Sequence, residues 1–140
     1  MKSLHKIVGI VVVVIFLLTG QYLEFYYPEM RGVGEGMRMM LRSRHIYILL
    51  AGLVNLGIGI YLTPRAKLWR KALQLAGSWL IIGAPFLLVS AFFYEPVLPG
   101  LQRTFTLPAI VSLFSGTLLH LLSGAGAGKL ERMTNERQES

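Results

Sequence analysis

The sequence predicts an all-α protein, a bundle of four transmembrane helices. Of its 140 residues, 54% are hydrophobic and only 15% are charged, well below the roughly 25% that is usual in soluble domains. The apolar residues come in four long blocks, and the charged residues gather between them. A helix that crosses a bilayer needs about 20 mainly apolar residues, so each block suits one crossing. We expect a single membrane domain over residues 1–140.

Charged residues and prolines set the expected helix boundaries. No small-x-small cleavage site follows the first apolar run, so we expect it to be retained as a helix. A long loop, Glu24 to Arg44, comes next, and its last part, Met37 to Arg44, is predicted as a helical lead-in. Pro64 ends the second helix, and Pro85 is expected to kink the third. The predicted helices cover about residues 5–23, 45–63, 72–94 and 105–123.

The distribution of Lys and Arg predicts the orientation. The side with both chain ends carries nine of the fourteen Lys and Arg residues, and the opposite side carries five. Positive charge is enriched in cytoplasmic loops, so we expect a multi-pass protein of the cell's inner (plasma) membrane with both termini cytoplasmic. The basic residues lie at the ends of apolar blocks, as expected for contact with lipid head groups. The net charge of +7 therefore predicts the lipid bilayer, not nucleic acid, as partner.

Small residues predict which face of each helix packs against a neighbour, because helices in membranes associate where small side chains permit close approach. Each of the three histidines, His5, His45 and His120, falls on the small-residue face of its helix. The predicted faces of the second and fourth helices are His45, Ile48, Gly52, Asn55 and Gly59, and Ala109, Ser112, Gly116, His120 and Ser123.

The composition excludes several chemistries. With no cysteine, the chain forms no disulfide and offers no thiolate ligand to zinc, haem or an iron–sulfur cluster. It also has no aspartate, so a Ser–His–Asp triad and an aspartyl dyad are excluded. No motif indicates a particular reaction, and the sequence leaves open whether the chain is an enzyme.

His5 and His120 are the first candidate site. Both fall in the predicted cytoplasmic leaflet, at the start of the first helix and within the fourth. Two imidazoles that face each other across a bundle are suited to ligate a haem or a metal. The alternative is that His5 is an interfacial residue and that His120 hydrogen-bonds to a neighbouring helix.

The second candidate site lies on the opposite side, where Met30, Met37, Met39 and Met40 precede His45. Thioether and imidazole groups suit Cu(I), so Met37, Met40 and His45 form a candidate metal site. The alternative is an apolar interfacial segment in which methionine serves as adaptable filler. Asn55, a polar residue in the middle of the second helix, is expected to hold helices together, with a substrate contact as the alternative.

The beginning of the chain resembles small four-helix membrane proteins of the HemJ-type protoporphyrinogen oxidase and CopD-like copper protein families. The resemblance is carried by Leu4-His5, by Thr19-Gly20-Gln21-Tyr22-Leu23 and by the basic entry Arg38 to Arg44. It implies a haem or copper role with His5 as a ligand.

Two functions follow from these observations. The first is a non-catalytic membrane subunit or assembly partner, which would associate with another membrane protein or with a second copy of itself. The alternative is a haem- or metal-binding redox protein that uses His5 and His120.

Overall fold

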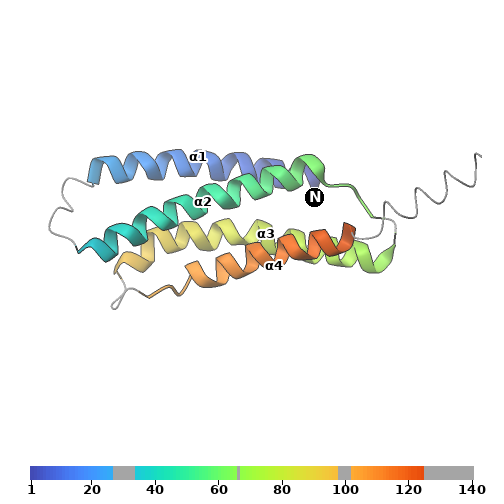
Figure 1. The fold of residues 1–140 in the computed structure, drawn as a ribbon. Coiled ribbons are helices and arrows are strands. Elements are labelled where there is room, and N and C mark those ends of the chain that lie inside the picture. The colour runs from blue at the N-terminus through green and yellow to red at the C-terminus, as the bar shows by residue number, and fades with distance from the viewer. Residues whose placement is uncertain (27–33, 66, 98–101, 125–140) are drawn as a thin grey trace, which may run out of the picture.

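The computed structural model describes residues 1–26, 34–65, 67–97 and 102–124. Its helices run up and down along one axis (Figure 1). Each of the four long helices is long and apolar enough to cross a membrane. The predicted fold class, an all-α bundle of four helices, is therefore confirmed. The elements are α1 (Lys2–Tyr26), α2 (Glu35–Tyr61), α3 (Leu68–Tyr94), the short 3-10 helix η2 (Glu95–Val97) and α4 (Thr106–Gly124).

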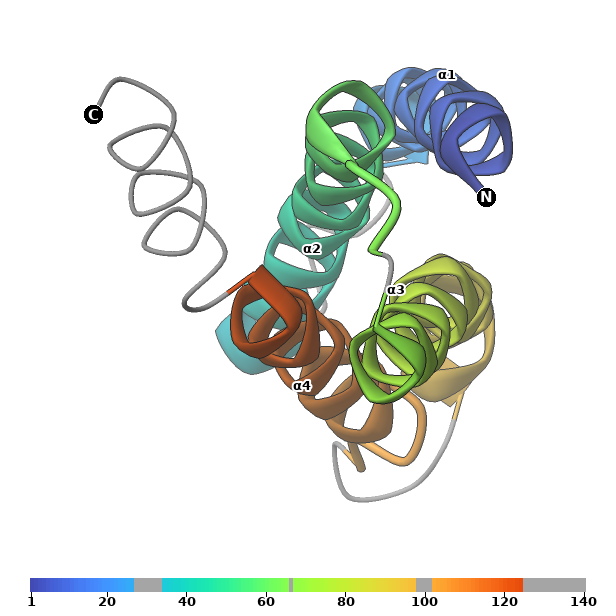
Figure 2. The ribbon, with the colours of Figure 1, turned by 90° about the vertical axis from the view of Figure 1, so that its right-hand side faces the viewer.

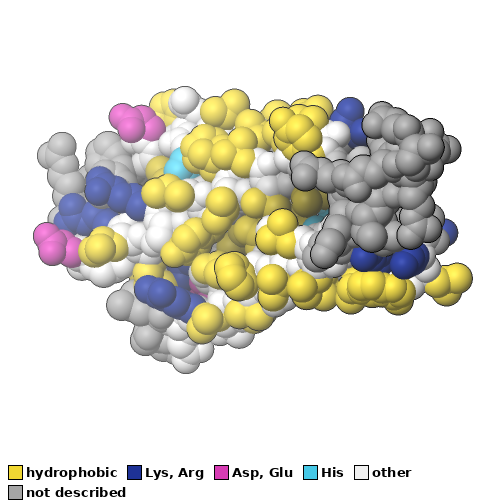
Figure 3. Space-filling view, turned by 45° about the vertical axis from the view of Figure 1, so that its right-hand side comes forward, with side chains coloured by type: hydrophobic (Ala, Val, Ile, Leu, Met, Phe, Trp, Pro, Cys, Tyr) yellow, Lys and Arg dark blue, Asp and Glu magenta, His cyan; other side chains and the backbone are white. Residues whose placement is uncertain are grey.

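The surface of the bundle has the pattern of a protein surrounded by lipid. Hydrophobic side chains cover the middle of the face in Figure 3, and Lys and Arg side chains gather toward its two ends. Large apolar side chains such as Leu18, Phe114 and Leu121 are exposed on this surface. In lipid such exposure carries no penalty, because the surrounding chains are as apolar as the side chains themselves.

The four helices form two close pairs. α1 packs mainly on α2 and α3 on α4, while α2 joins the pairs by its contact with α3 (Figure 2). Glycines permit the closest approaches: a Cβ atom on Gly77 would lie 2.7 Å from the backbone oxygen of Gly116, and the reverse distance is the same. On α2, Gly52 and Gly59 meet α1 in the same way. The expectation that Gly52, Gly59 and Gly116 face other helices is confirmed.

The second helix begins earlier than predicted. α2 starts at Glu35 and therefore includes residues 35–44, the last part of the predicted loop Glu24 to Arg44. Met37 to Arg44 is indeed helical, but it continues into the apolar segment without a break. An acid in the first turn, here Glu35, stabilises a helix start through the helix dipole. The buried face of α2 includes Arg44 together with Ile48, Gly52, Asn55 and Gly59. His45 is partly buried and packs on α1, as predicted.

A buried ion pair ties α2 to the connection between α3 and α4. Nη2 of Arg44 lies 2.7 Å from Oε2 of Glu95, and the two side chains are 2% and 0% exposed. Oε1 of Glu95 accepts hydrogen bonds from the backbone N–H groups of Phe105 and Thr106, and Oε2 accepts one from the Thr106 hydroxyl. Glu95 thus satisfies the first N–H groups of α4, which have no partner within the helix.

The protonation of Glu95 follows from this environment. Burial raises the pKa of the Glu95 carboxyl, but the hydrogen bonds from Thr106 and Phe105 and the charge of Arg44 lower it, and the net pKa is below its ordinary value. Glu95 is therefore ionised at neutral pH, and the ion pair is a fixed structural element of this end of the bundle.

Candidate functional site

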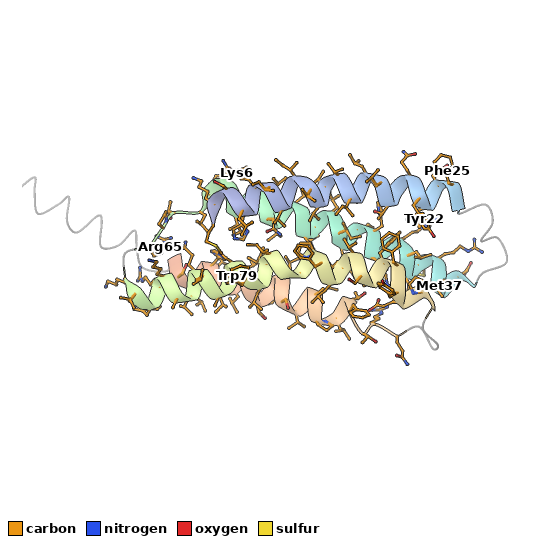
Figure 4. The ribbon with its side chains drawn as sticks, turned by 180° about the vertical axis from the view of Figure 1, so that it is seen from behind. Lys6, Tyr22, Phe25, Met37, Arg65 and Trp79 are labelled. Atoms are coloured by element: carbon orange, nitrogen blue, oxygen red, sulfur yellow. The ribbon has the colours of Figure 1, made fainter. Side chains whose placement is uncertain are left out.

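Each of the four long helices contributes one polar side chain to a single cluster inside the bundle. The members are His5 from α1, Asn55 from α2, Ser78 from α3 and His120 from α4, and we call them the polar centre. His5 and Asn55 are fully buried, Ser78 is 1% exposed and His120 is half-buried. The centre lies toward the end of the bundle that Lys6 and Arg65 mark in Figure 4. Polar groups in such apolar surroundings are costly unless they are bonded.

Glycines bring the four side chains together. A Cβ atom on Gly59, one turn after Asn55, would lie 2.9 Å from the backbone nitrogen of Lys6. Only glycine permits this approach of α1, which places His5 on Asn55. In the second helix pair, a Cβ atom on Gly77 would lie 3.0 Å from Cδ2 of His120. The small residue next to Ser78 therefore admits the imidazole ring of α4.

The hydrogen bonds of Asn55 determine the protonation of His5. Nδ2 of Asn55 donates to the backbone oxygens of Ala51, at 2.9 Å, and Ile81, at 3.1 Å. Since backbone oxygens only accept, this assigns the nitrogen and oxygen of the amide. Oδ1 of Asn55, 2.9 Å from Nδ1 of His5, must then accept its hydrogen. Nε2 of neutral His5 consequently carries a lone pair, and this buried atom has no partner among the described residues.

His120 is held in a comparable way by α3. Its Nε2 lies 3.1 Å from the hydroxyl oxygen of Ser78. When the hydroxyl accepts the Nε2 hydrogen, Nδ1 of His120 carries the lone pair. Each ring then has one nitrogen bonded to an oxygen and the other free to bind, which is the usual arrangement around metal-binding histidines. Ser123 adds a local restraint, since its hydroxyl donates to the backbone oxygen of His120 at 2.7 Å.

The two histidines that the sequence pointed to lie side by side. Their ring centres are 6.1 Å apart and their planes meet at 78°. With metal–nitrogen distances of about 2.0–2.1 Å, two imidazoles that share one ion place their ring centres about 5 Å apart at a tetrahedral ion and about 6.4 Å apart at a linear one. The observed separation lies within this range. Within the described residues no three His, Cys, Asp or Glu side chains form a metal-binding group, so further ligands would have to be water molecules.

Neither of two cavities at this end of the bundle is lined by both histidines. The larger cavity at this end, about 520 Å³, is lined by Ser78 but by neither histidine. The cavity that His120 lines measures about 180 Å³ and does not reach His5. A macrocycle with both rings as axial ligands needs one cavity that both line. These two cavities therefore lend no support to a haem between the rings, and the haem role of His5 and His120 stays a prediction.

The other candidate metal ligand, His45, contacts α1. Nδ1 of His45 lies 3.0 Å from the hydroxyl oxygen of Thr19, and its ring stacks on Phe16 with centres 4.1 Å apart. Met40 and His45 are five positions apart on one continuous helix, about 7.5 Å along its axis and about 140° around it. The copper site of Met37, Met40 and His45 stays a prediction, while Met30 lies outside the described residues.

Two parts of this arrangement were not predicted from the sequence. Ser78 was not predicted as a polar partner, although it directly follows Gly77, where α4 approaches α3. The ion pair of Arg44 and Glu95 was also missed, because both residues were counted as charges at helix ends. The spacing Arg44, Ile48, Asn55 does carry the signal, since these positions share one helical face.

No known family model, curated protein or solved structure matches this chain.

Proposed function

We propose that this chain is a metal-binding membrane protein whose polar centre holds one transition-metal ion between His5 and His120. The observation that supports it is the buried Nε2 of His5, which has a lone pair by the argument from Asn55 and no partner among the described residues. An acceptor left unsatisfied in apolar surroundings costs about 1–3 kcal/mol. A bound ion would remove that cost and would use the second ring, 6.1 Å away.

The donor atoms define the class of ion. Imidazole nitrogen suits copper, zinc, iron and nickel, whereas magnesium, calcium and manganese prefer carboxylate oxygen. Asn55 and Ser78 contribute neutral oxygens to the centre, and the described acids, Glu24, Glu35 and Glu95, belong to the opposite end of the helices. A redox role requires an ion that changes its charge, so copper is the first ion to test.

The membrane setting of this proposal comes from the sequence. We place the protein in the inner (plasma) membrane with both termini cytoplasmic, because nine of fourteen basic residues fall on that side. The polar centre, near the start of α1 and the end of α4, then lies in the cytoplasmic half of the bilayer. An ion could reach it from the cytoplasm through the cavity of about 180 Å³ that His120 lines.

The second candidate function is a non-catalytic membrane subunit or assembly partner. One observation favours it: Asn55 bonds to His5 on α1, Ala51 on its own helix and Ile81 on α3. A single amide that joins three helices is suited to hold a bundle together. In this account His5 and His120 only pack and form hydrogen bonds, Nε2 of His5 receives a water molecule, and no metal is bound.

Metal binding by matched variants separates the two functions. The wild-type protein, purified in detergent and treated with a chelator, is titrated with Cu(I) and Zn(II) beside His5→Ala, His120→Ala and His45→Ala. The metal-binding account expects a saturable site that either of the first two substitutions removes and that His45→Ala leaves intact. If wild type binds neither ion more tightly than the His5→Ala variant, the packing account is correct.

A further inference from the structure

A second site lies at the same end of the bundle, between the start of α1 and α3. A cavity of about 520 Å³ opens there. Its lining combines cationic groups with an apolar wall, and none of the lining residues is acidic. The cations are Lys2, Arg65 and Lys71, and the apolar residues include Leu62, Pro64 and Leu75.

Among the described residues, no acidic side chain forms an ion pair with the cations of this cavity. The ion pair of Arg44 and Glu95, at the opposite end, is the salt bridge that the described residues form. Nε of Arg65 is buried and has no hydrogen-bond partner among the described residues. A topology signal alone requires only that basic side chains reach the head-group level. Three cations that line one cavity whose lining contains no acid favour an anionic ligand.

The cavity is aligned with an apolar groove along the same two helices. The groove, about 290 Å³, lies between residues 7–15 of α1 and residues 85–90 of α3. The basic cavity lies between residues 1–3 and residues 71–78 of the same helices. α1 and α3 make few direct contacts, and the end view shows them separated on this side of the bundle (Figure 2). A cationic site followed by an apolar groove matches a molecule with an anionic head and a hydrocarbon chain.

We propose that this seam between α1 and α3 binds an anionic phospholipid. The phosphate lies among Lys2, Arg65 and Lys71, and one acyl chain follows the groove beside Val11, Pro85 and Phe86. Arg65 offers planar, paired donors that suit phosphate oxygens. The recognised group is a phosphate, which a soluble phosphate compound could also supply. The apolar groove favours the lipid, because a soluble anion would leave it without a role. The cavity adjoins the polar centre, because Ser78 lines it, but the lipid proposal does not require a bound metal.

The test measures lipid binding by the chain in a neutral detergent, with native mass spectrometry and the thermal midpoint as readouts. Phosphatidylglycerol is compared with phosphatidylcholine of the same chain length and with inorganic phosphate. Each basic residue near a lipid phosphate contributes about fivefold in affinity. We therefore expect Arg65→Gln and Lys71→Gln each to weaken phosphatidylglycerol binding about fivefold. Lys67→Gln is the matched control, because Lys67 is an exposed cation in the connection between α2 and α3 that does not line the cavity.

The groove has its own pair of variants. Val11→Trp fills the groove and should weaken phosphatidylglycerol binding without a change in charge. Val14→Trp places the same ring on a similarly exposed position of α1 outside the groove and should have no such effect. The proposal is overturned if Lys67→Gln weakens binding as much as Lys71→Gln, or if phosphatidylcholine binds as tightly as phosphatidylglycerol. Equal stabilisation by inorganic phosphate alone would overturn the assignment to a lipid. Lys2→Gln and Lys71→Gln, both at exposed positions, keep the test valid if Arg65→Gln does not fold.

Discussion

Oδ1 of Asn55 accepts a hydrogen bond from Nδ1 of His5 at 2.9 Å, and this bond decides which nitrogen of His5 can bind a ligand. The orientation of the amide is fixed in turn by the backbone oxygens of Ala51 and Ile81. A side chain that the sequence marked as a link between helices therefore also controls the candidate metal ligand. The two roles can be separated by substitution.

Replacement of Asn55 should change metal binding through His5. Asn55→Leu removes the acceptor of the Nδ1 hydrogen, and loss of such a partner typically weakens metal binding by about 10–100-fold. Asn55→Asp keeps an acceptor at the same place, so its metal affinity should stay near that of wild type even if the bundle is less stable. Titration of both variants with Cu(I) in detergent measures this. Equal metal affinity in Asn55→Leu and wild type would show that Asn55 does not orient His5.

The ion pair at the other end should control stability in acid. Because the pKa of Glu95 is lower in the folded chain than its ordinary value of 4.5, ionised Glu95 stabilises the fold fully above that value. This stabilisation is lost as the pH falls through the lower, folded-state pKa. Glu95→Gln leaves Arg44 buried without its counter-charge and should lower the free energy of unfolding by about 3–5 kcal/mol near neutral pH.

Thermal unfolding in detergent from pH 7 to pH 3 tests the role of Glu95. The wild-type midpoint should fall steeply at the acid end, and the midpoint of Glu95→Gln should be lower at pH 7 and less dependent on pH. Glu24→Gln removes an exposed carboxylate of α1 and serves as the control, with a curve like that of wild type. A Glu95→Gln curve that follows wild type at every pH would contradict the structural role of the pair.

Glycine substitutions should distinguish the close helix contact from the outer surface of the bundle. A Cβ atom on Gly116 would lie 2.7 Å from the backbone oxygen of Gly77, so Gly116→Ala forces α3 and α4 apart. Such overpacking costs about 1–3 kcal/mol. A Cβ atom on Gly83 of α3 meets nothing within 4 Å, so Gly83→Ala should leave the midpoint unchanged or raise it. The measurement is the thermal midpoint of both variants in detergent. Equal thermal midpoints for Gly116→Ala and Gly83→Ala would contradict the close contact between α3 and α4.

Much of the fold could be predicted from the sequence, because a helix that can cross a bilayer requires a continuous apolar segment, which is visible in the sequence alone. Long apolar blocks between charges identified all four helices, and small residues identified Gly52, Gly59 and Gly116 as contacts. The start of α2 was misplaced because Met37 to Arg44 is basic, and basic residues usually indicate the membrane boundary. In the structure, burial beside Glu95 allows Arg44 to continue the helix core.

The candidate site was predicted only in part. His5 and His120 were paired by depth alone, since both fall near the same end of their helices. The contact of Ser78 with His120 follows from the pairing of α3 with α4. The periodicity of a single sequence does not show which helices are neighbours, so this contact could not be predicted. The protonation of His5 depends on hydrogen bonds that join α1, α2 and α3, and these become visible only when the relative positions of the helices are known.

The proposed orientation predicts the result of reporter fusions. A reporter fused after Ser140 should be active only in its cytoplasmic form, and a reporter inserted at Gly34 should be active only in its exported form. The reason is the excess of Lys and Arg on the side of both termini. A chain in which Arg65, Lys67, Arg70 and Lys71 are replaced by Gln should show a mixed orientation. An exported signal from the Ser140 fusion of the unaltered chain would reverse the proposed topology.

X-ray absorption at the copper edge tests the proposed metal centre most directly, because it reports which atoms surround a bound ion. The sample is the wild-type chain in detergent after loading with copper and removal of the excess. The account predicts stoichiometric copper with the scattering of two imidazole rings, lost in both His5→Ala and His120→Ala. Copper with sulfur neighbours would instead assign the ion to Met37, Met40 and His45. A wild-type protein that retains no stoichiometric copper would contradict the metal centre and leave the packing role for both histidines.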